Sequence, residues 1–300
     1  MELRVLRYFT AVAKEESITR AAETLHLSQP ALSRQLRALE EELGKTLLIR
    51  GSRKTTLTGE GRLLYKRANE IIELERKAEA EIRQPDEFTG GDVWIGSGET
   101  DGMALLARTA HSLRDEYPDF HFHLISGNWI DIEERLDKGL VDFGVAFGNV
   151  DSGKYDFFQL PIVHSRGLLM RSDSPLASRA SIGPGDLLGL HGRPGLPLIS
   201  SRNEDARLGM EKWMGRKFKM LNIVATYNLI YNAAFLVEEG IGYALCIDRL
   251  IPQRQVPLRF VPFRPRIDVR VNMAWKKNRI FSKASLKFLE RLREITELPL

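Results

Sequence analysis

A short set of polar and basic side chains has the residue types that read DNA bases. Its members lie in the first turns of residues 29–43, and they are Gln29, Pro30, Ser33, Arg34 and Arg37. On a helix, which turns by about 100° per residue, Pro30, Ser33, Arg34 and Arg37 lie opposite a face of leucines. Side chains at the start of such a helix reach base edges in the major groove, and Arg37 lies closer to phosphate. An ordinary solvated amphipathic helix would have the same pattern, so the flanking segments decide between the two interpretations.

The flanking segments predict a helix-turn-helix. Apolar residues at helical spacing indicate a first helix from Leu3, and Ser17 caps a short second helix. A tight turn at residues 26–27 follows. Ser28 is a good N-cap for the third helix, and Gly44 is a good residue to end it. We therefore expect the third helix to be the recognition helix, with Ser28 among the DNA contacts.

A basic hairpin follows the third helix. Residues 47–50 and 55–57 have the pattern of two short strands around a Gly-Ser turn. The cations of this wing are Arg50, Arg53 and Lys54. They are expected to lie along the sugar-phosphate backbone, where they add affinity and register without sequence information.

The positive charge of the chain is concentrated in the same segment. The formal net charge is +4, and residues 1–66 contain twelve Lys and Arg against eight Asp and Glu. The remaining 234 residues hold 32 of each sign and contribute nothing to the excess. A polyanion partner is therefore expected for the N-terminal segment alone.

The N-terminal segment resembles the LysR-type transcriptional regulators, and every spacing of the family pattern is kept. The matching residues are Phe9, Ser17, Ala21-Ala22, Leu25, Ser28-Gln29-Pro30-Ala31-Leu32-Ser33, Leu39-Glu40, Leu43-Gly44, Leu47, Arg50, Leu57-Thr58 and Gly61. Leu48 departs from the pattern, because the family usually has Phe there. The resemblance implies a regulator with a winged helix-turn-helix. Its partners would be double-stranded promoter or operator DNA, an unknown small-molecule effector, RNA polymerase and further copies of itself, as a homodimer or homotetramer.

A long helix is expected after the hairpin. Thr58 caps it, and it runs from Gly59 to Arg83 with a coiled-coil-like apolar spacing that Glu75 interrupts. The apolar residues are Leu64, Ala68, Ile71, Ala78 and Ile82. This helix could pack on its own domain or pair with a second copy, and the resemblance implies a homodimer. Pro85-Asp86-Glu87, with Gly90-Gly91, predicts a hinge after it.

From Asp92 onward, short β-rich runs alternate with helical ones. The first set has strands at 92–96, 120–125 and 141–147, with helices near 103–116 and 129–138. The second set has strands at 196–200, 221–226 and 243–247, with helices near 205–214 and 229–238. Two successive βαβαβ sets predict an α/β fold of two similar lobes with parallel sheets. A ligand is expected in the cleft between the lobes, beyond the carboxyl ends of the strands.

Loops at these strand ends offer hydroxyl groups and free backbone N–H groups. The first loop, residues 96–100, leaves a strand and enters a helix. The LysR resemblance implies a C-terminal domain like a periplasmic binding protein, in which this loop makes the first contact with the effector. The candidate effector-binding residues are Ser97, Gly98, Thr100, Ser126 and Gly127 in lobe one, and Ser200, Ser201, Thr226 and Asn228 in lobe two.

Acidic residues beside the first loop would oppose a carboxylate effector. Glu99 and Asp101 precede the predicted helix, and we interpret them as capping residues rather than ligand contacts. Further along, residues 237–245 resemble the glycine-rich helix-to-strand passage of the family, and Ile247 stands where the family commonly has proline.

The expected domains follow from these segments. Residues 1–58 form a winged helix-turn-helix, residues 59–88 a dimerisation helix and hinge, and residues 89–300 an effector-binding domain. Within the last, lobe one comprises 89–161 and 266–300, and lobe two comprises 162–265.

Other chemistries have weaker support. His121 and His123 share a face of a predicted strand, but two ligands without a third do not make a metal site. Cys246 lies in an apolar strand without a partner and is expected to be core packing. An enzyme is therefore a weaker alternative to a regulator, and no catalytic residue, metal or cofactor is expected. A solute-binding protein would fit the two lobes, but the basic winged segment and the lack of an export signal favour a cytoplasmic regulator.

Overall fold

The computed structural model describes residues 1–51, 54–83, 88–189, 195–250 and 257–297. The chain divides into two compact units, Met1–Gln84 and Pro85–Leu300. Arg53 of the predicted wing and the predicted hinge at residues 85–87 lie outside the described residues.

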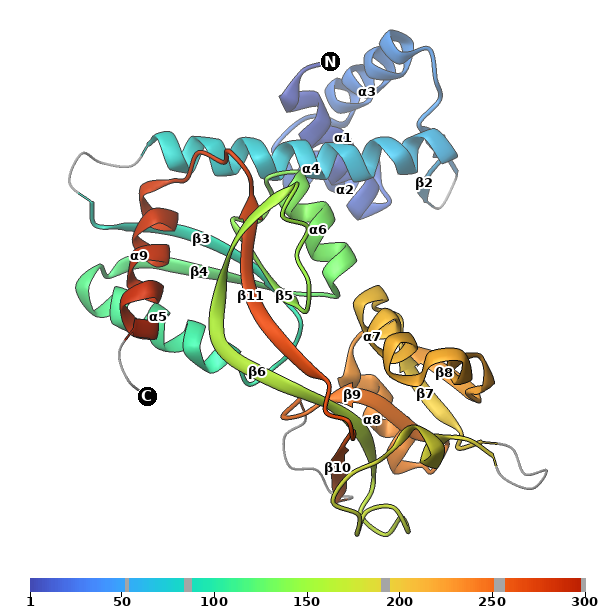
Figure 1. Cartoon of the computed structure of the whole chain (residues 1–300). Helices are drawn as coiled ribbons and strands as arrows, with labels where there is room; N and C mark the ends of the chain where they lie inside the picture. Colours follow the sequence, from blue (N-terminus) through green and yellow to red (C-terminus); the bar gives the residue numbers. More distant parts are fainter. Residues whose placement is uncertain (52–53, 84–87, 190–194, 251–256, 298–300) are drawn as a thin grey trace. The chain divides into compact units, whose positions relative to one another are not determined.

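The N-terminal unit contains the expected helices and hairpin (Figure 1). Its elements are α1 (Leu3–Glu15), α2 (Ile18–Thr24), α3 (Gln29–Leu43), β1 (Leu48–Arg50), β2 (Thr55–Leu57) and α4 (Gly59–Ile82). The Ser17 side chain accepts a hydrogen bond from the Arg20 amide, and Gly44 ends α3 at a φ of 62°. The leucine face of α3 packs with Phe9 of α1 in a shared apolar core. The predicted order of elements is therefore confirmed.

Ser28 does not cap α3 through its side chain. It stands at the N-cap position with extended backbone, but its hydroxyl makes no capping hydrogen bond. The amides of Ala31 and Leu32 donate to its carbonyl oxygen instead. The expected cap is wrong in this respect, and the helix leaves the exposed hydroxyl available at its first turn.

Glu40 fixes the hairpin to the recognition helix. Its Oε1 accepts hydrogen bonds from the amides of Leu47 and Leu48 at 2.8 and 3.0 Å, and its Oε2 lies 3.0 Å from Arg50. β1 and β2 pair antiparallel, with Leu48 opposite Leu57. The carboxylate is therefore a structural part of the wing.

Helix α4 packs on its own unit over its first turns. Ala68 is buried, and Leu64 joins the apolar core. Glu75, which interrupts the apolar spacing, lies 2.6 Å from Arg7 of α1. Further along, Ile71 and Ile82 are exposed. The first turns of α4 therefore pack on their own unit, and the exposed later turns leave apolar surface for pairing with a second copy.

The C-terminal unit contains two lobes of the same design. Lobe one has β3 (Gly90–Ser97), α5 (Met103–Glu116), β4 (Asp119–Ser126), α6 (Trp129–Asp137), β5 (Phe143–Phe147) and α9 (Lys283–Glu297). Lobe two has η1 (Pro184–Leu187), β7 (Leu198–Ser201), α7 (Glu204–Met214), η2 (Gly215–Met220), β8 (Ile223–Tyr227), α8 (Ile230–Glu238), β9 (Tyr243–Ile247) and β10 (Leu258–Pro262). β3 pairs in parallel with β4 and β5, and β7 pairs in parallel with β8 and β9. The two predicted βαβαβ sets are confirmed.

Two long strands join the lobes, and the sequence patterns above do not predict them. β6 (Tyr155–Arg171) and β11 (Asp268–Lys276) pair antiparallel, and Figure 1 shows them side by side. Since β11 also pairs with β5 and β6 with β9, the described strands form one sheet of order β4-β3-β5-β11-β6-β9-β7-β8, with β10 on β6. Helices cover both faces of each half: α5 and α9 lie opposite α6 in lobe one, and α7 lies opposite α8 in lobe two.

None of the helices in the described part of the chain combines the length and apolar character that crossing a bilayer requires.

Two glycines in the first turn of α4 make a matched pair for testing the N-terminal unit. A Cβ on Gly61 would lie 2.1 Å from the carbonyl oxygen of Leu47, whereas a Cβ on Gly59 would meet nothing within 4 Å. We expect Gly61→Ala to destabilise this unit by about 1–3 kcal/mol through overpacking. Gly59→Ala should be neutral or stabilising by up to about 1 kcal/mol. Thermal unfolding of both variants measures the difference, and equal melting temperatures would contradict the close approach.

Candidate nucleic-acid interface and ligand pocket

The start of α3 presents its polar side to solvent. Gln29, Pro30, Arg34 and Arg37 are exposed, and Ser33 is half-buried. Within the described residues, the side chains of Arg34 and Arg37 make no hydrogen bond or ion pair. Both guanidinium groups are therefore available to an external hydrogen-bond acceptor such as a guanine edge or a phosphate.

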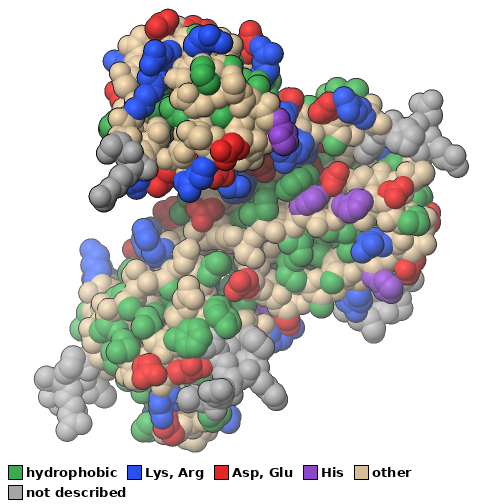
Figure 2. Space-filling model, turned by 180° about the vertical axis from the view of Figure 1, so that it is seen from behind, with side chains coloured by type: hydrophobic (Ala, Val, Ile, Leu, Met, Phe, Trp, Pro, Cys, Tyr) green, Lys and Arg blue, Asp and Glu red, His purple; other side chains and the backbone are tan. Residues whose placement is uncertain are grey.

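The described cations of the wing are engaged within the unit. Arg50 contacts Glu40, and the Lys54 ammonium lies 3.2 Å from the Glu16 carboxylate. Exposed pairs of this kind are worth about 0.2–1 kcal/mol, so a phosphate can compete for the lysine at small cost. Figure 2 shows Lys and Arg side chains spread over the N-terminal unit, interspersed with acidic ones. The accessible positive charge is therefore smaller than the residue count suggests.

A cavity of about 120 Å³ lies between the two lobes of the C-terminal unit. Its wall is formed by strand ends and helix starts of both lobes. The lining residues are Gly98, Glu99, Gly127, Asn128, Trp129, Val145, Phe147, Arg166, Ser201, Asn203, Ala206, Tyr227, Asn228, Leu229, Ile230, Leu245, Cys246, Ile247, Leu250 and Val269. The position agrees with the expected cleft beyond the carboxyl ends of the parallel strands.

The structure brings four of the nine candidate effector residues to this cavity: Gly98, Gly127, Ser201 and Asn228. The other five, Ser97, Ser126, Thr100, Ser200 and Thr226, are not in its wall. The Ser97 hydroxyl is buried and donates to the Gly98 carbonyl at 2.7 Å, and the Thr100 hydroxyl lies 3.0 Å from Nε2 of His164. The predicted loops are therefore at the cavity, but alternate side chains along them turn away from it.

Arg166 is the basic residue of the cavity wall, and the sequence analysis missed it. Burial lowers the pKa of its guanidinium, which nevertheless remains charged. Among the described residues, its side chain makes no hydrogen bond or ion pair within 4.0 Å. Gly209 of α7 leaves room for it, since a Cβ there would lie 3.4 Å from Nε. The sequence signal that could have found it is an arginine two residues before the apolar run Leu168–Met170, where a charged side chain needs a polar partner or a ligand.

Three helices begin at the cavity. Asn128 caps α6 by accepting a hydrogen bond from the Asp131 amide, and Asn203 caps α7 by accepting one from the Ala206 amide. α8 begins after Leu229, which also lines the cavity. The positive ends of the three helix dipoles therefore lie in the cavity wall, one from lobe one and two from lobe two. Together with Arg166 they make the local field favourable to an anion.

Glu99 and Asp101 do not cap the following helix. α5 begins after Gly102 without a side-chain capping bond. Glu99 is exposed in the cavity wall, and the Asp101 carboxylate lies 3.5 Å from the guanidinium of Arg249. The capping interpretation is therefore wrong, and one acidic residue remains at the ligand cavity.

The two histidines and the cysteine that were considered for metal binding or catalysis lie in ordinary packing or surface environments. His123 contacts Asp92 at 2.5 Å and stacks on Trp94, whereas His121 is exposed. The described ranges contain no group of three side chains that could hold a metal ion. Cys246 is buried in β9 and packs in the apolar core of lobe two.

Two family models match the chain. One, "Bacterial regulatory helix-turn-helix protein, lysR family", covers residues 3–62, and the other, "LysR substrate binding domain", covers residues 87–297. The chain belongs to the LysR family. It is a DNA-binding transcriptional regulator with an effector-binding domain.

Relatives of this LysR-type regulator match over nearly their whole length. The regulator BsdA of Bacillus subtilis is 30% identical over 298 residues, which cover 97% of this chain and 99% of BsdA. The Hca operon transcriptional activator HcaR of Escherichia coli is 31% identical over 284 residues, which cover 92% of each protein. Among solved structures, CbnR, a LysR family regulator, has a TM-score of 0.75 at 21% identity and covers 99% of this chain and 100% of its own. This last likeness supports the fold.

Burial also determines the chemistry of the cavity's thiol. It raises the pKa of Cys246 to about 12, so the reactive thiolate is scarce in the folded LysR-type regulator. We expect iodoacetamide at about pH 8.5 to alkylate Cys246 much more slowly in the native protein than in guanidinium chloride. Mass spectrometry measures both rates, and equal rates would contradict a protected thiol. The pKa of the Cys246 thiol is higher in the folded than in the unfolded protein. Its contribution to the free energy of unfolding is therefore present at neutral pH and is lost as the pH rises from about 9 towards 12.

Proposed function

We propose that this LysR-type regulator acts in the cytoplasm as a homodimer or homotetramer on operator DNA, beside RNA polymerase, and has no enzymatic role. We further propose that it senses a small carboxylate whose anionic group binds Arg166. The half-buried Arg166 guanidinium, which makes no ion pair within 4.0 Å in the wall of the interlobe cavity, is the observation that carries the proposed effector class.

The proposed DNA contacts divide by chemistry. Gln29, Pro30, Ser33 and Arg34 read bases, because they are accessible at the start of α3. Contacts to the sugar-phosphate backbone come from Ser28, Arg37, Arg50, Arg53 and Lys54. The exposed Ile71 and Ile82 of α4 support pairing with a second copy, since a coiled-coil seam would bury them.

The proposed ligand combines one anionic group with a compact apolar body. A half-buried arginine without an ion-pair partner favours a carboxylate, with which it forms two parallel hydrogen bonds. Trp129, Phe147, Leu229 and Leu250 supply apolar wall opposite the polar groups. Benzoate, a small aromatic carboxylate, has the chemistry that such a cavity selects and is a suitable probe.

The division between base and phosphate contacts predicts that one arginine variant and one lysine variant lose DNA binding in different ways. Sequencing the DNA that copurifies with the protein supplies the operator. Arg34→Ala should then cost about 1–3 kcal/mol of operator binding and relax sequence preference. Lys54→Ala, the matched wing variant, should weaken operator and random DNA alike and lower the salt slope by about 1. Competition assays decide, and an unchanged specific-to-random ratio for Arg34→Ala would remove its base-reading role.

The Arg166 assignment predicts charge-dependent ligand binding. Benzoate at 100 times its dissociation constant should stabilise the protein by about 2.7 kcal/mol, and neutral benzamide should have little effect. Arg166→Met keeps most of the side-chain length but removes the charge, so benzoate affinity should fall roughly 10- to 100-fold. Arg259→Met, at an exposed arginine of β10, is the control and should bind benzoate normally. Equal stabilisation by benzoate and benzamide would overturn the carboxylate assignment; thermal shift and calorimetry measure both.

A further inference from the structure

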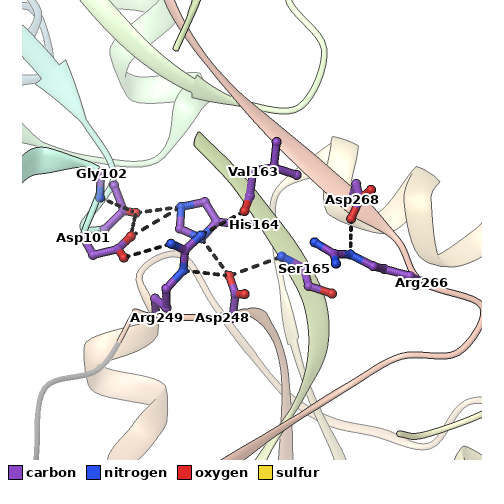
Figure 3. Close-up of polar contacts among 10 residues, drawn as sticks. Asp101, Gly102, Val163, His164, Ser165, Asp248, Arg249, Arg266 and Asp268 are labelled. Carbon is purple, nitrogen blue, oxygen red and sulfur yellow. Dashed lines mark hydrogen bonds and ion pairs between the residues drawn. The ribbon is translucent and has the colours of Figure 1, made fainter. Parts of the chain in front are cut away.

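A histidine side chain is completely buried where the two lobes meet. His164 lies on β6, and 0% of its side chain is exposed. Nδ1 lies 2.8 Å from Oδ1 of Asp248, which follows β9 of lobe two, and Nε2 lies 3.0 Å from the Thr100 hydroxyl of lobe one. Figure 3 shows the imidazole held between the two sides. A polar ring without solvent depends on both partners, because a lost hydrogen bond there is not replaced by water.

An ion pair runs beside the histidine. The Arg249 guanidinium of lobe two lies 3.5 Å from Oδ2 of Asp101 in lobe one, and it donates to the Val163 carbonyl at 2.9 Å. Arg249 has a left-handed backbone conformation, with a φ of 56°, which is uncommon for a residue with a side chain. In this conformation its guanidinium contacts both Asp101 and the Val163 carbonyl.

The same two loops line the ligand cavity. Gly98 and Glu99 of the wall directly precede Thr100 and Asp101, and Ile247 of the wall directly precedes Asp248. A change in the distance between the loops therefore changes the cavity and these polar contacts together.

We propose that Thr100, Asp101, His164, Asp248 and Arg249 form an interlobe clamp that sets the population of closed lobes. This proposal rests on the proposed function, because lobe closure has a regulatory consequence only if the cavity binds an effector. A ligand that prefers the closed cavity and an intact clamp then stabilise the same state, so each strengthens the other. The Thr100 hydroxyl serves the clamp in this arrangement and does not contact the ligand.

The test measures lobe separation in the full chain without ligand. Spin labels on Arg114→Cys in α5 and Lys217→Cys in η2, both exposed positions, report the distance between lobes by pulsed electron resonance. Labelled subunits are diluted with unlabelled ones to suppress distances between copies. The buried Cys246 remains in place, and protein without the added cysteines gives its background labelling.

Arg249→Met should lengthen and broaden the distance distribution, with a 2- to 5-fold higher open-to-closed ratio, roughly the effect expected of a half-exposed pair. Asp101→Asn, an isosteric change at an exposed position, should do the same. The double variant should open the lobes by less than the sum of the two single variants, because both remove the Asp101–Arg249 ion pair, while Asp101 also contacts His164 and Arg249 also contacts Asp248. Arg259→Met should match the wild type. Distributions for Arg249→Met and Asp101→Asn that overlay the wild type would overturn the clamp, and so would additive effects in the double variant.

Benzoate separates this proposal from the effector assignment. If benzoate fails to bind but the single variants open the lobes, the clamp stands and the carboxylate assignment fails. If benzoate binds through Arg166 and the variants leave the lobes unchanged, the clamp fails alone. Where both hold, Arg249→Met should weaken benzoate binding by up to about 5-fold, because apparent affinity falls with the competent fraction.

Discussion

The antiparallel pairing of β6 with β11 is the constraint on which the ligand-binding unit depends. Each lobe has its own parallel strands and its own covering helices, and these would suffice for two separate domains. β6 pairs with β11 from Tyr155 to Ser165 and then with β9 up to Leu169, so one strand passes from the first lobe to the second. His164 and Arg166 lie at this passage. A polar group placed there lies within reach of both lobes, which neither parallel sheet alone could provide.

Local patterns predict the parts of this fold that are made locally. Helical periodicity places α2, α3 and α5, and the Ser17 cap also marks the start of α2, because the interactions that form these helices span only a few residues. β6 and β11 are different, since Phe158 pairs with Met273 and their register depends on a contact between distant segments. The site shows the same division. Loops at strand ends predict Gly98 and Asn228, but Arg166 comes from a crossing strand whose position no local pattern defines.

The polar residues of the glycine-rich loops predict some ligand contacts incorrectly, and for one physical reason. Thr100 and Ser97 have hydroxyl groups of the right kind, yet each is already hydrogen-bonded within the protein. The charge count has the same weakness in the N-terminal unit, where Arg50 is bound to Glu40. Residue type predicts which chemistry a side chain can perform. Whether that side chain is available to an external ligand depends on partners that only the folded chain brings together.

The unpaired Arg166 is costly for the folded protein, and this cost is an argument for its role. Moving a guanidinium out of water carries an effective penalty of several kcal/mol unless a partner compensates. Asp205 stands nearby on α7, but it accepts a hydrogen bond from the Asn149 amide, and burial raises its pKa. Its carboxylate makes no ion pair with the Arg166 guanidinium within 4.0 Å, so it does not fully compensate that charge. Natural sequences keep such local conflicts chiefly at functional sites. A ligand carboxylate would compensate the charge of Arg166. The same contact would therefore supply binding free energy and favour closure of the lobes around the ligand.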